Sequence, residues 1–347
     1  MMNIIDLKKE DFLKIQTDFL NNNNSQKNFW SLSFLQSLQW SEIQENYGQH
    51  VFLRGLESDN KIIGFFVAIE KKIWQSKKYW YIPRGPIFFD DNKDFWLDFF
   101  LILKKQSLDK NLKFIRLEPI NPSFLDYYQR NKSNLIKTID VQPSKTSFLN
   151  LNLSEDDLMK NLGQKTRYNI KLAQKKGIEV SELGLDGFKE FWKLMSITAG
   201  RDNFFIHSKE YYNNLISSDN DFIKLFSACF KGKVLAMGIF SFFGSTVSYL
   251  HGASSNEMRN LMAPYLLQWE LIKIAKNRGF KYYDFYGVDE KKWPGVSRFK
   301  NGFSGEKFSF PGTFDYIIDN NFYKLYKFFR HTRKKIKSSI NIIKKIF

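Results

Sequence analysis

The chain has 347 residues, of which 43% are hydrophobic and 17% aromatic. This composition excludes a globally disordered protein, and the length suits two domains better than one. The formal net charge of +17 at pH 7 indicates an anionic partner, such as a nucleic acid, a phosphorylated substrate or a membrane surface.

The sequence also argues against several kinds of site and segment. Cys229 is the single cysteine, so no internal disulfide can form, and no Cys/His group has metal-ligand spacing; we expect no metal site. The first residues, MMNIIDLKKEDF, include acids and lack the apolar core of a signal peptide. No run approaches the roughly 18 apolar residues of a membrane span. We therefore expect a cytoplasmic protein.

Two halves of the chain share one pattern. Residues 50–70 and 222–243 each predict two strands joined by a polar turn, at Ser58–Asn60 and at Lys231–Gly232. Residues 95–118 and 265–286 each predict an apolar helix, a polar stop and a strand. Because both matches recur at an offset of about 170 residues, we expect two duplicated α/β units with mixed sheets.

A cationic helix follows the predicted linker at 141–153. We expect it to run from Ser154, which can cap its first turn, to Lys176, before a stop at Gly177. One side carries small and apolar residues, Leu162, Thr166, Ile170 and Ala173, and another carries Arg167, Lys171 and Lys175, with Lys165 nearby. A solvated face and a phosphate-rich partner both fit this stripe.

The end of the chain is basic and amphipathic. From Asn321 to Phe347 there are nine Lys or Arg residues and no Asp or Glu. The apolar residues, at 322, 325, 326, 329, 336, 340, 343 and 347, have helical spacing. Docking on the body of the protein, contact with an anionic membrane and contact with RNA are all compatible with this pattern.

An ordered set of segments resembles the Fem aminoacyltransferases, the FemABX family. The segments are SFLQSLQW (33–40), PRGPIF (83–88), KTRYNIKLAQKKGIEV (165–180), TAGRDNFF (198–205), YLHGAS (249–254), APYLLQWELIKIA (263–275), YYDFYGV (282–288) and RFKNGFSGEKFSFPGTFD (298–315). The resemblance covers nearly the whole chain. It implies an α/β fold of two tandem GNAT-like (acyl-CoA N-acyltransferase-like) domains, in the shorter, FemX-like form without a coiled-coil arm. We place the first domain at 1–148 plus a returning basic helix at 316–347, and the second at 149–315.

The resemblance also implies a reaction. An amino acid would pass from aminoacyl-tRNA to the stem-peptide amine of a peptidoglycan precursor, either lipid II or UDP-MurNAc-pentapeptide, to build the interpeptide bridge of the cell wall. Both substrates are polyanions, which suits the net charge. We expect no cofactor besides the aminoacyl-tRNA co-substrate, and a cytoplasmic enzyme that meets the inner face of the plasma membrane through its basic tail.

Coenzyme A is a less suitable donor on the residues themselves. Acetyltransferases hold its pyrophosphate with backbone N–H groups of a glycine-containing loop at a helix N-terminus. The corresponding segment here, RNLMAPYLL, has Met262 and Pro264 in place of glycines, and proline has no N–H to donate.

The resemblance assigns roles to individual residues. Lys300 is the expected catalytic group, a cation that stabilises the oxyanion or the leaving ribose oxygen. Arg201 is expected to bind precursor phosphate, although an ion pair with Asp202 is an open alternative. The remaining expected substrate contacts are Tyr249, Phe299, Arg84, Asp284, Lys165, Arg167 and Lys171.

Two positions depart from the family pattern. Phe205 stands where the family has a tyrosine, and Gln44 stands where it has a phosphate-binding lysine. His251 lies in an apolar strand context, where we expect a structural histidine, and no Ser/His/Asp set is evident.

Three rival functions stay open: aminoacyl transfer to a protein N-terminus, a divergent acyl-coenzyme A N-acyltransferase, and a non-catalytic RNA- or membrane-binding protein.

Overall fold

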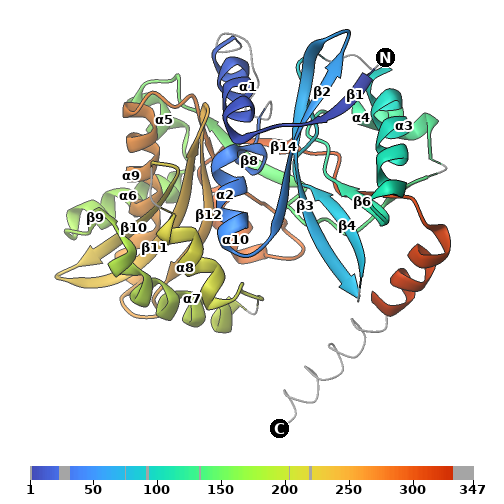
Figure 1. The fold of residues 1–347 in the computed structure, drawn as a ribbon. Coiled ribbons are helices and arrows are strands. Elements are labelled where there is room, and N and C mark those ends of the chain that lie inside the picture. Colours follow the sequence, from blue (N-terminus) through green and yellow to red (C-terminus); the bar gives the residue numbers. More distant parts are fainter. Residues whose placement is uncertain are drawn as a thin grey trace. The chain divides into compact units, whose positions relative to one another are not determined.

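The structure is a computed structural model that describes residues 2–22, 32–74, 76–90, 94–132, 134–202, 204–218 and 221–330 (Figure 1). The chain forms two compact units. Unit 1 comprises Met1–Phe12, Gln49–Ile139 and Pro311–Phe347, and unit 2 comprises Leu13–Gly48 and Asp140–Phe310. The predicted division assigned Leu13–Gly48 to the first domain, whereas in the structure this segment packs within unit 2. No helix in the described ranges is both long and apolar enough to cross a membrane.

Unit 1 is built on a mixed sheet with the strand order β1-β2-β3-β4-β6-β15-β7, and β5 pairs with β3. The strands are β1 (Met2–Asp6), β2 (His50–Ser58), β3 (Lys61–Trp74), β4 (Lys77–Ile82), β5 (Ile87–Phe88), β6 (Leu112–Leu117), β7 (Leu135–Lys137) and β15 (Phe314–Ile317). Helix α3 (Asp94–Asp109) buries Trp96, Phe99 and Leu103 in one core with strand residues such as Phe66 and Ile115. Helix α4 (Phe124–Arg130) contributes Phe124 to the same core.

Unit 2 is built on a second mixed sheet, ordered β14-β8-β13-β12-β11-β10-β9. Its strands are β8 (Lys145–Asn150), β9 (Glu179–Leu183), β10 (Ile223–Phe230), β11 (Lys233–Phe243), β12 (Thr246–Ser254), β13 (Tyr282–Asp284) and β14 (Glu306–Ser309). Its helices are α2 (Leu38–Asn46), α5 (Glu155–Asn161), α6 (Gln164–Lys175), α7 (Phe188–Asp202), α8 (Lys209–Ser217), α9 (Ala263–Asn277) and α10 (Pro294–Asn301), with short 3₁₀ turns at Phe34–Gln36, Leu185–Gly187 and Arg259–Leu261. Helix α1 (Lys9–Asn22) begins in unit 1 and continues into unit 2.

Both faces of the unit 2 sheet are covered. Because successive strand residues point to opposite faces, β11 sends Ala236 to one core and Met237 to the other. The first core joins α6 and α9 to the sheet, and the second joins α2, α7 and α8 to it. The predicted apolar side of α6 is confirmed, since Thr166, Ile170 and Ala173 are buried.

The predicted repeat is confirmed strand by strand. The two expected hairpins are β2–β3 and β10–β11, and the two helix–strand pairs are α3–β6 and α9–β13. Each unit also inserts a third antiparallel strand, β4 or β12, before its helix. That strand then pairs in parallel with the strand after the helix, β4 with β6 and β12 with β13.

The predicted single helix from Ser154 to Lys176 is wrong, because the chain breaks between α5 and α6. Leu162 and Gly163 have extended backbone conformations, and the N–H of Gly163 donates to the carbonyl of Gly302 at 3.0 Å. The expected ends are confirmed. Ser154 accepts the N–H of Asp157 at 3.1 Å, and Gly177 ends α6 at a φ of +78°.

The described part of the C-terminal segment docks on unit 1. Residues 320–330 are helical, and Tyr323 is buried against Phe114 at a ring distance of 5.4 Å. The hydroxyl of Tyr323 donates to Asp315 at 2.7 Å. The predicted apolar positions 336, 340, 343 and 347 lie outside the described residues.

Candidate active site

In unit 2, two parallel strands part partway along their length. Strand β13 pairs with β12 only over Thr246–Ser248, whereas β12 continues to Ser254. Ligands of α/β sheets commonly bind beyond the carboxyl ends of parallel strands. Four of the predicted site residues gather here: Tyr249 on β12, Asp284 at the end of β13, and Phe299 and Lys300 on α10.

Lys300 is held by backbone oxygens at this point. Its ammonium group donates to the carbonyl of Tyr286 at 3.0 Å and to that of Gly287 at 2.9 Å. The residue is only 6% exposed, and burial lowers the pKa of Lys300 to about 8, while the charge of Asp284 acts in the opposite direction. An ammonium has three donors, so two carbonyls leave it with capacity for one further acceptor. Lys300 is therefore a largely protonated cation at neutral pH, already oriented.

The turn that holds Lys300 is itself fixed by hydrogen bonds to Asp284 and Thr146. Tyr286 and Gly287 both have positive φ, at 48° and 94°, which makes their carbonyls point together toward the lysine. The N–H of Tyr286 donates to Asp284 at 3.0 Å, and the N–H of Gly287 donates to the Thr146 hydroxyl at 3.4 Å. That hydroxyl also donates to the carboxylate of Asp284. Thr146 was missed from the sequence, where it lies in a short strand within the predicted linker at 141–153 and has no distinguishing signal.

Aromatic rings form the walls around Lys300. The lysine lies 5.5 Å from the ring centre of Tyr249, a cation–π distance. The Tyr249 ring stacks on Phe240 at 5.2 Å, and burial raises the pKa of its hydroxyl, which stays a hydrogen-bond donor. Phe299 packs edge-on against Tyr265 at 5.0 Å. These rings keep water away from the lysine, which strengthens its interaction with developing negative charge.

The half-buried His251 has the properties of a structural residue. His251 packs against the rings of Tyr212 at 5.0 Å and His207 at 5.7 Å. Burial lowers the pKa of His251 to about 3, with smaller contributions from His207 and Lys300. The imidazole is thus neutral at physiological pH, and an amine substrate would lose its proton to so weak a base with difficulty.

Arg201 is engaged within the protein. It forms the ion pair with Asp202 that the sequence left open, at 2.9 and 3.0 Å. Its other N–H groups donate to the carbonyl and hydroxyl of Ser254, both at 3.1 Å, and to Asn256 at 3.0 Å. Since a guanidinium has five N–H donors and all are bonded here, phosphate binding would require Arg201 to exchange partners. Phosphate binding by Arg201 stays a prediction.

Phe205 and Gln44, the two departures from the family pattern, differ in their exposure to solvent. Phe205 is 88% exposed, so its ring is accessible although it has no hydroxyl to donate. Gln44 is buried within α2, where a neutral side chain avoids the desolvation cost of a lysine.

The cations of α6 divide into two groups. Lys165 and Lys171 are exposed, as a contact surface requires. Arg167 instead donates to the carbonyls of Lys160, at 2.7 Å, and of Leu162, where α5 ends. The helix is also joined to the Lys300 region, because Gly163 bonds Gly302 two residues after the lysine. Arg84 belongs to unit 1, where it is buried with a φ of 51°, and the structure does not test its predicted contact with substrate.

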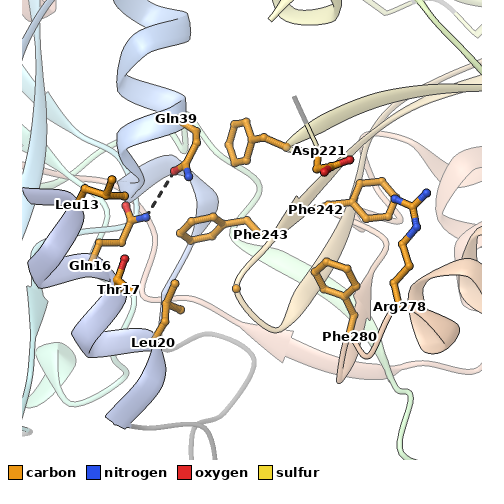
Figure 2. A pocket seen from close by; sticks show the side chains of 12 residues that line it. Leu13, Gln16, Thr17, Leu20, Gln39, Asp221, Phe242, Phe243, Arg278 and Phe280 are labelled. Atoms are coloured by element: carbon orange, nitrogen blue, oxygen red, sulfur yellow. Dashed lines mark hydrogen bonds between the residues drawn. The ribbon is translucent and has the colours of Figure 1, made fainter. Parts of the chain in front are cut away.

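A separate cavity of about 750 Å³ lies in unit 2 (Figure 2). Its walls are mostly apolar, and Gln16, Gln39, Asp221 and Arg278 add polar groups. Arg278 lies over the ring of Phe242 at 5.3 Å and bonds Glu182 at 3.4 Å. None of the Lys300 cluster lines this cavity. Within the described ranges, no group of His, Cys, Asp or Glu residues is placed to hold a metal ion.

Comparison with known proteins decides the family. The model of the FemAB family matches residues 20–231 and 220–331. The chain belongs to the FemAB family. Two relatives are each called a lipid II:glycine glycyltransferase. The protein of Staphylococcus haemolyticus is 24% identical over 57% of this chain and 65% of its own length, slightly under two thirds. The protein of Staphylococcus aureus is 22% identical over 90% of this chain and 94% of its own length.

Solved structures confirm the predicted fold of this FemAB protein. The crystal structure of FemX matches with a TM-score of 0.77 at 20% identity, over 93% of this chain and 99% of that one. A tandem GNAT protein from the clavulanic acid pathway matches with a TM-score of 0.57 at 7% identity, over 92% of this chain and 99% of that one. The chain therefore has two tandem GNAT-like folds, as the family resemblance implied, and the internal repeat had predicted two α/β units.

Proposed function

We propose that this FemAB protein is an aminoacyltransferase that moves an amino acid from aminoacyl-tRNA to the stem-peptide amine of a peptidoglycan precursor. The observation that carries the proposal is the buried, backbone-held ammonium of Lys300 near the end of β13, where β12 and β13 part. The names of the relatives support the acceptor class, lipid II, and make glycine the first amino acid to test. UDP-MurNAc-pentapeptide is the soluble alternative acceptor. Because charged tRNA is cytoplasmic, the proposed reaction belongs on that side of the membrane.

The proposed step is a direct transfer. The acceptor amine attacks the ester carbonyl carbon, a C–N bond forms, and the carbonyl oxygen becomes an oxyanion. Collapse of this intermediate breaks the ester C–O bond and releases the ribose oxygen, which takes up a proton, while the attacking nitrogen loses one to water. Lys300 would place its third N–H on the oxyanion or on the leaving oxygen. A preorganised cation in a buried site typically lowers such a barrier by several kcal/mol.

The start of α9 supports a donor other than coenzyme A. Met262 precedes the helix at a φ of 59°, and Pro264 in its first turn has no N–H. The N–H of Tyr265 is already bonded to the carbonyl of Met262 at 2.9 Å. A pyrophosphate at this described helix end would find few of the backbone donors that acetyltransferases supply.

The charge distribution supports polyanionic substrates. Lys165 and Lys171 extend outward on α6, whose N-terminus bonds the chain beside Lys300. A tRNA backbone could thus contact α6 while its aminoacyl end lies beside Lys300. Binding of this kind weakens with salt.

The experiment supplies glycyl-tRNA and a mixture of other charged tRNAs to the purified protein, with lipid II or UDP-MurNAc-pentapeptide as acceptor. Mass spectrometry should show an acceptor heavier by one or more aminoacyl residues, and Lys300→Met should abolish most of it. Acetyl-coenzyme A and a peptide with a free N-terminus test the two rival donors and acceptors.

Each negative result would favour one of the rival functions. If no charged tRNA supports transfer to either precursor, while the protein still binds RNA or vesicles, the non-catalytic alternative replaces the proposal. If acetyl-coenzyme A is the donor that works, the interpretation of the α9 terminus is wrong.

A further inference from the structure

Four large apolar side chains are exposed together on unit 1. Trp74, at the end of β3, contacts Phe329 with ring centres 6.4 Å apart, although the two are far apart in the chain. The exposed fractions are 58% for Trp74, 45% for Leu325, 64% for Phe328 and 51% for Phe329. We call these four residues the aromatic patch. Such a cluster marks an interaction surface, because exposing contiguous apolar area to water is unfavourable.

Residues on the helix face away from the aromatic patch fix the orientation of the helical residues 320–330. Tyr323 is buried, and its hydroxyl bonds Asp315 at 2.7 Å. Asp319 accepts the N–H of Phe322 at 2.9 Å, and Arg330 donates to Thr138 at 3.2 Å. The helix is therefore anchored through one face and presents Leu325, Phe328 and Phe329 on the opposite one.

Cations lie close to the aromatic patch in the chain. Lys72 and Lys77 flank Trp74 in the β3–β4 hairpin, and the helical segment adds Lys324 and Lys327. Lys71 and Lys78, in the same hairpin, are bonded to Gln49 at 2.8 Å and to Glu70 at 2.9 Å. The carboxylates nearby are already paired, Glu70 with Lys78 at 2.9 Å and Asp319 with Lys113 at 3.1 Å. The surface thus combines exposed apolar rings with an excess of positive charge.

We propose that the aromatic patch inserts into the interface of an anionic lipid bilayer, with the nearby lysines on the headgroups. Trp and Phe side chains favour the boundary between headgroups and acyl chains, and basic residues near it gain about 1 kcal/mol each from anionic lipids. An amphipathic helix lying in the membrane plane uses the same arrangement. Nucleic acid fits less well, because Leu325 offers no stacking surface for a base. The proposal stands on unit 1 alone and goes beyond the transfer reaction.

The experiment measures co-sedimentation of the full chain with vesicles of phosphatidylcholine, alone or mixed with phosphatidylglycerol. The wild type should bind the anionic vesicles more strongly, and less so as salt rises. The triple variant Trp74→Ser/Phe328→Ser/Phe329→Ser should lose at least about ten-fold in partition coefficient, since three apolar anchors are removed. The double variant Lys324→Gln/Lys327→Gln should lose the salt-dependent part of binding.

Helix α3 supplies matched controls in the same unit. Leu97, Leu101 and Leu108 are 48%, 59% and 64% exposed, so their triple substitution by Ser removes a similar number of exposed apolar groups. Lys104→Gln/Lys105→Gln changes the net charge as much as the patch double variant does. Both controls should bind vesicles like the wild type. Transfer to the soluble UDP-MurNAc-pentapeptide, or thermal unfolding if no transfer exists, shows that each variant is folded.

Three outcomes would overturn the proposal. The α3 controls could lose vesicle binding as much as the patch variants do. The patch variants could bind vesicles normally but lose affinity for tRNA, which would make the surface an RNA site. The wild type could also show equal, weak binding to neutral and anionic vesicles.

Discussion

The backbone of Tyr286 connects Asp284 to Lys300. The N–H of Tyr286 donates to the Asp284 carboxylate at 3.0 Å, and the carbonyl of Tyr286 accepts from the Lys300 ammonium at 3.0 Å. The carboxylate therefore fixes the turn that fixes the cation. Asp284 is buried, and its charge raises the pKa of Lys300 against the effect of burial. This geometry favours a positioning role for Asp284, beside its predicted role in orienting the acceptor amine.

The first prediction concerns Asp284→Asn. The amide keeps the size of the side chain and an acceptor for Tyr286, but it removes the negative charge. The pKa of Lys300 should then fall below its present value of about 8. We expect kcat at neutral pH to drop roughly ten-fold with KM for tRNA little changed, and the alkaline limb of the pH–rate profile to move to lower pH.

Thr146 provides the matched test of positioning. Thr146→Ser keeps the hydroxyl that bonds Asp284 and Gly287, and it should behave like the wild type. Thr146→Val keeps the shape without the hydrogen bonds and should lower kcat. If both Asp284→Asn and Thr146→Val leave the pH profile unmoved, the clamp does not act on Lys300.

The second prediction concerns Lys300 itself. Lys300→Met should reduce kcat by about 10² to 10³, the usual effect of removing one oxyanion donor. In the wild type, activity should fall as pH rises through about 8, because the neutral amine no longer carries the charge. Initial rates of transfer across this range provide the measurement, and a rate that rises through pH 8 would instead indicate that the neutral amine is the active form.

Lys300 also makes the free energy of unfolding depend on pH. The pKa of Lys300 is lowered from 10.5 to about 8 by folding, so between these values the unfolded chain binds more protons than the folded one. Stability therefore rises with pH across this window and gains nothing below it. Denaturant titrations at neutral and alkaline pH should show the wild type gaining stability relative to Lys300→Met as pH increases. An equal change in both proteins would contradict the low pKa.

Local patterns in the sequence were enough to predict the repeated hairpins and helices. Polar turns such as Lys231–Gly232 lie between alternating strands, and the cap at Ser154 and the stop at Gly177 are chemical properties of those residues. The motif around Lys300 singled out this residue through resemblance alone, and its catalytic role stays a prediction. These features depend on residues close together in the chain.

What the sequence could not predict depends on distant partners. Helix α6 starts afresh because Gly163 bonds Gly302, and Arg201 is occupied because Ser254 and Asn256 meet it in space. The sequence left open whether the apolar positions 322, 325, 326 and 329 face the protein, a membrane or RNA, and the choice depends on such distant partners. Tyr323 turns inward to reach Asp315, which leaves positions 325 and 329 exposed.

The third prediction separates the cations of α6. Lys165→Gln/Lys171→Gln should raise KM for tRNA several-fold at low salt and less at high salt, with unchanged stability, because both side chains are exposed. Lys189→Gln/Lys193→Gln on α7 makes the same charge change elsewhere and should leave KM unchanged. Equal effects from both pairs would mean that net charge alone is responsible.

Arg167 should behave differently from its neighbours. Because it bonds the carbonyls of Lys160 and Leu162, Arg167→Gln should destabilise the fold by about 1–3 kcal/mol. Urea denaturation measures this loss, and it should be independent of tRNA. A variant with normal stability and a raised KM would return Arg167 to the predicted substrate contacts.

The fourth prediction uses Gly252 as a probe of Tyr249. A Cβ at Gly252 would lie 1.5 Å from the Tyr249 hydroxyl, so Gly252→Ala must drive the ring from its place beside Lys300. We expect a loss of roughly 1–3 kcal/mol in stability and a lower kcat, because the ring that packs beside Lys300 is displaced. In a Tyr249→Ala background the same alanine has no ring to displace. It should then cost much less, and a double-mutant cycle should give a coupling of about 0.5–3 kcal/mol. Additive effects would show that Gly252 is required for a reason other than the placement of Tyr249.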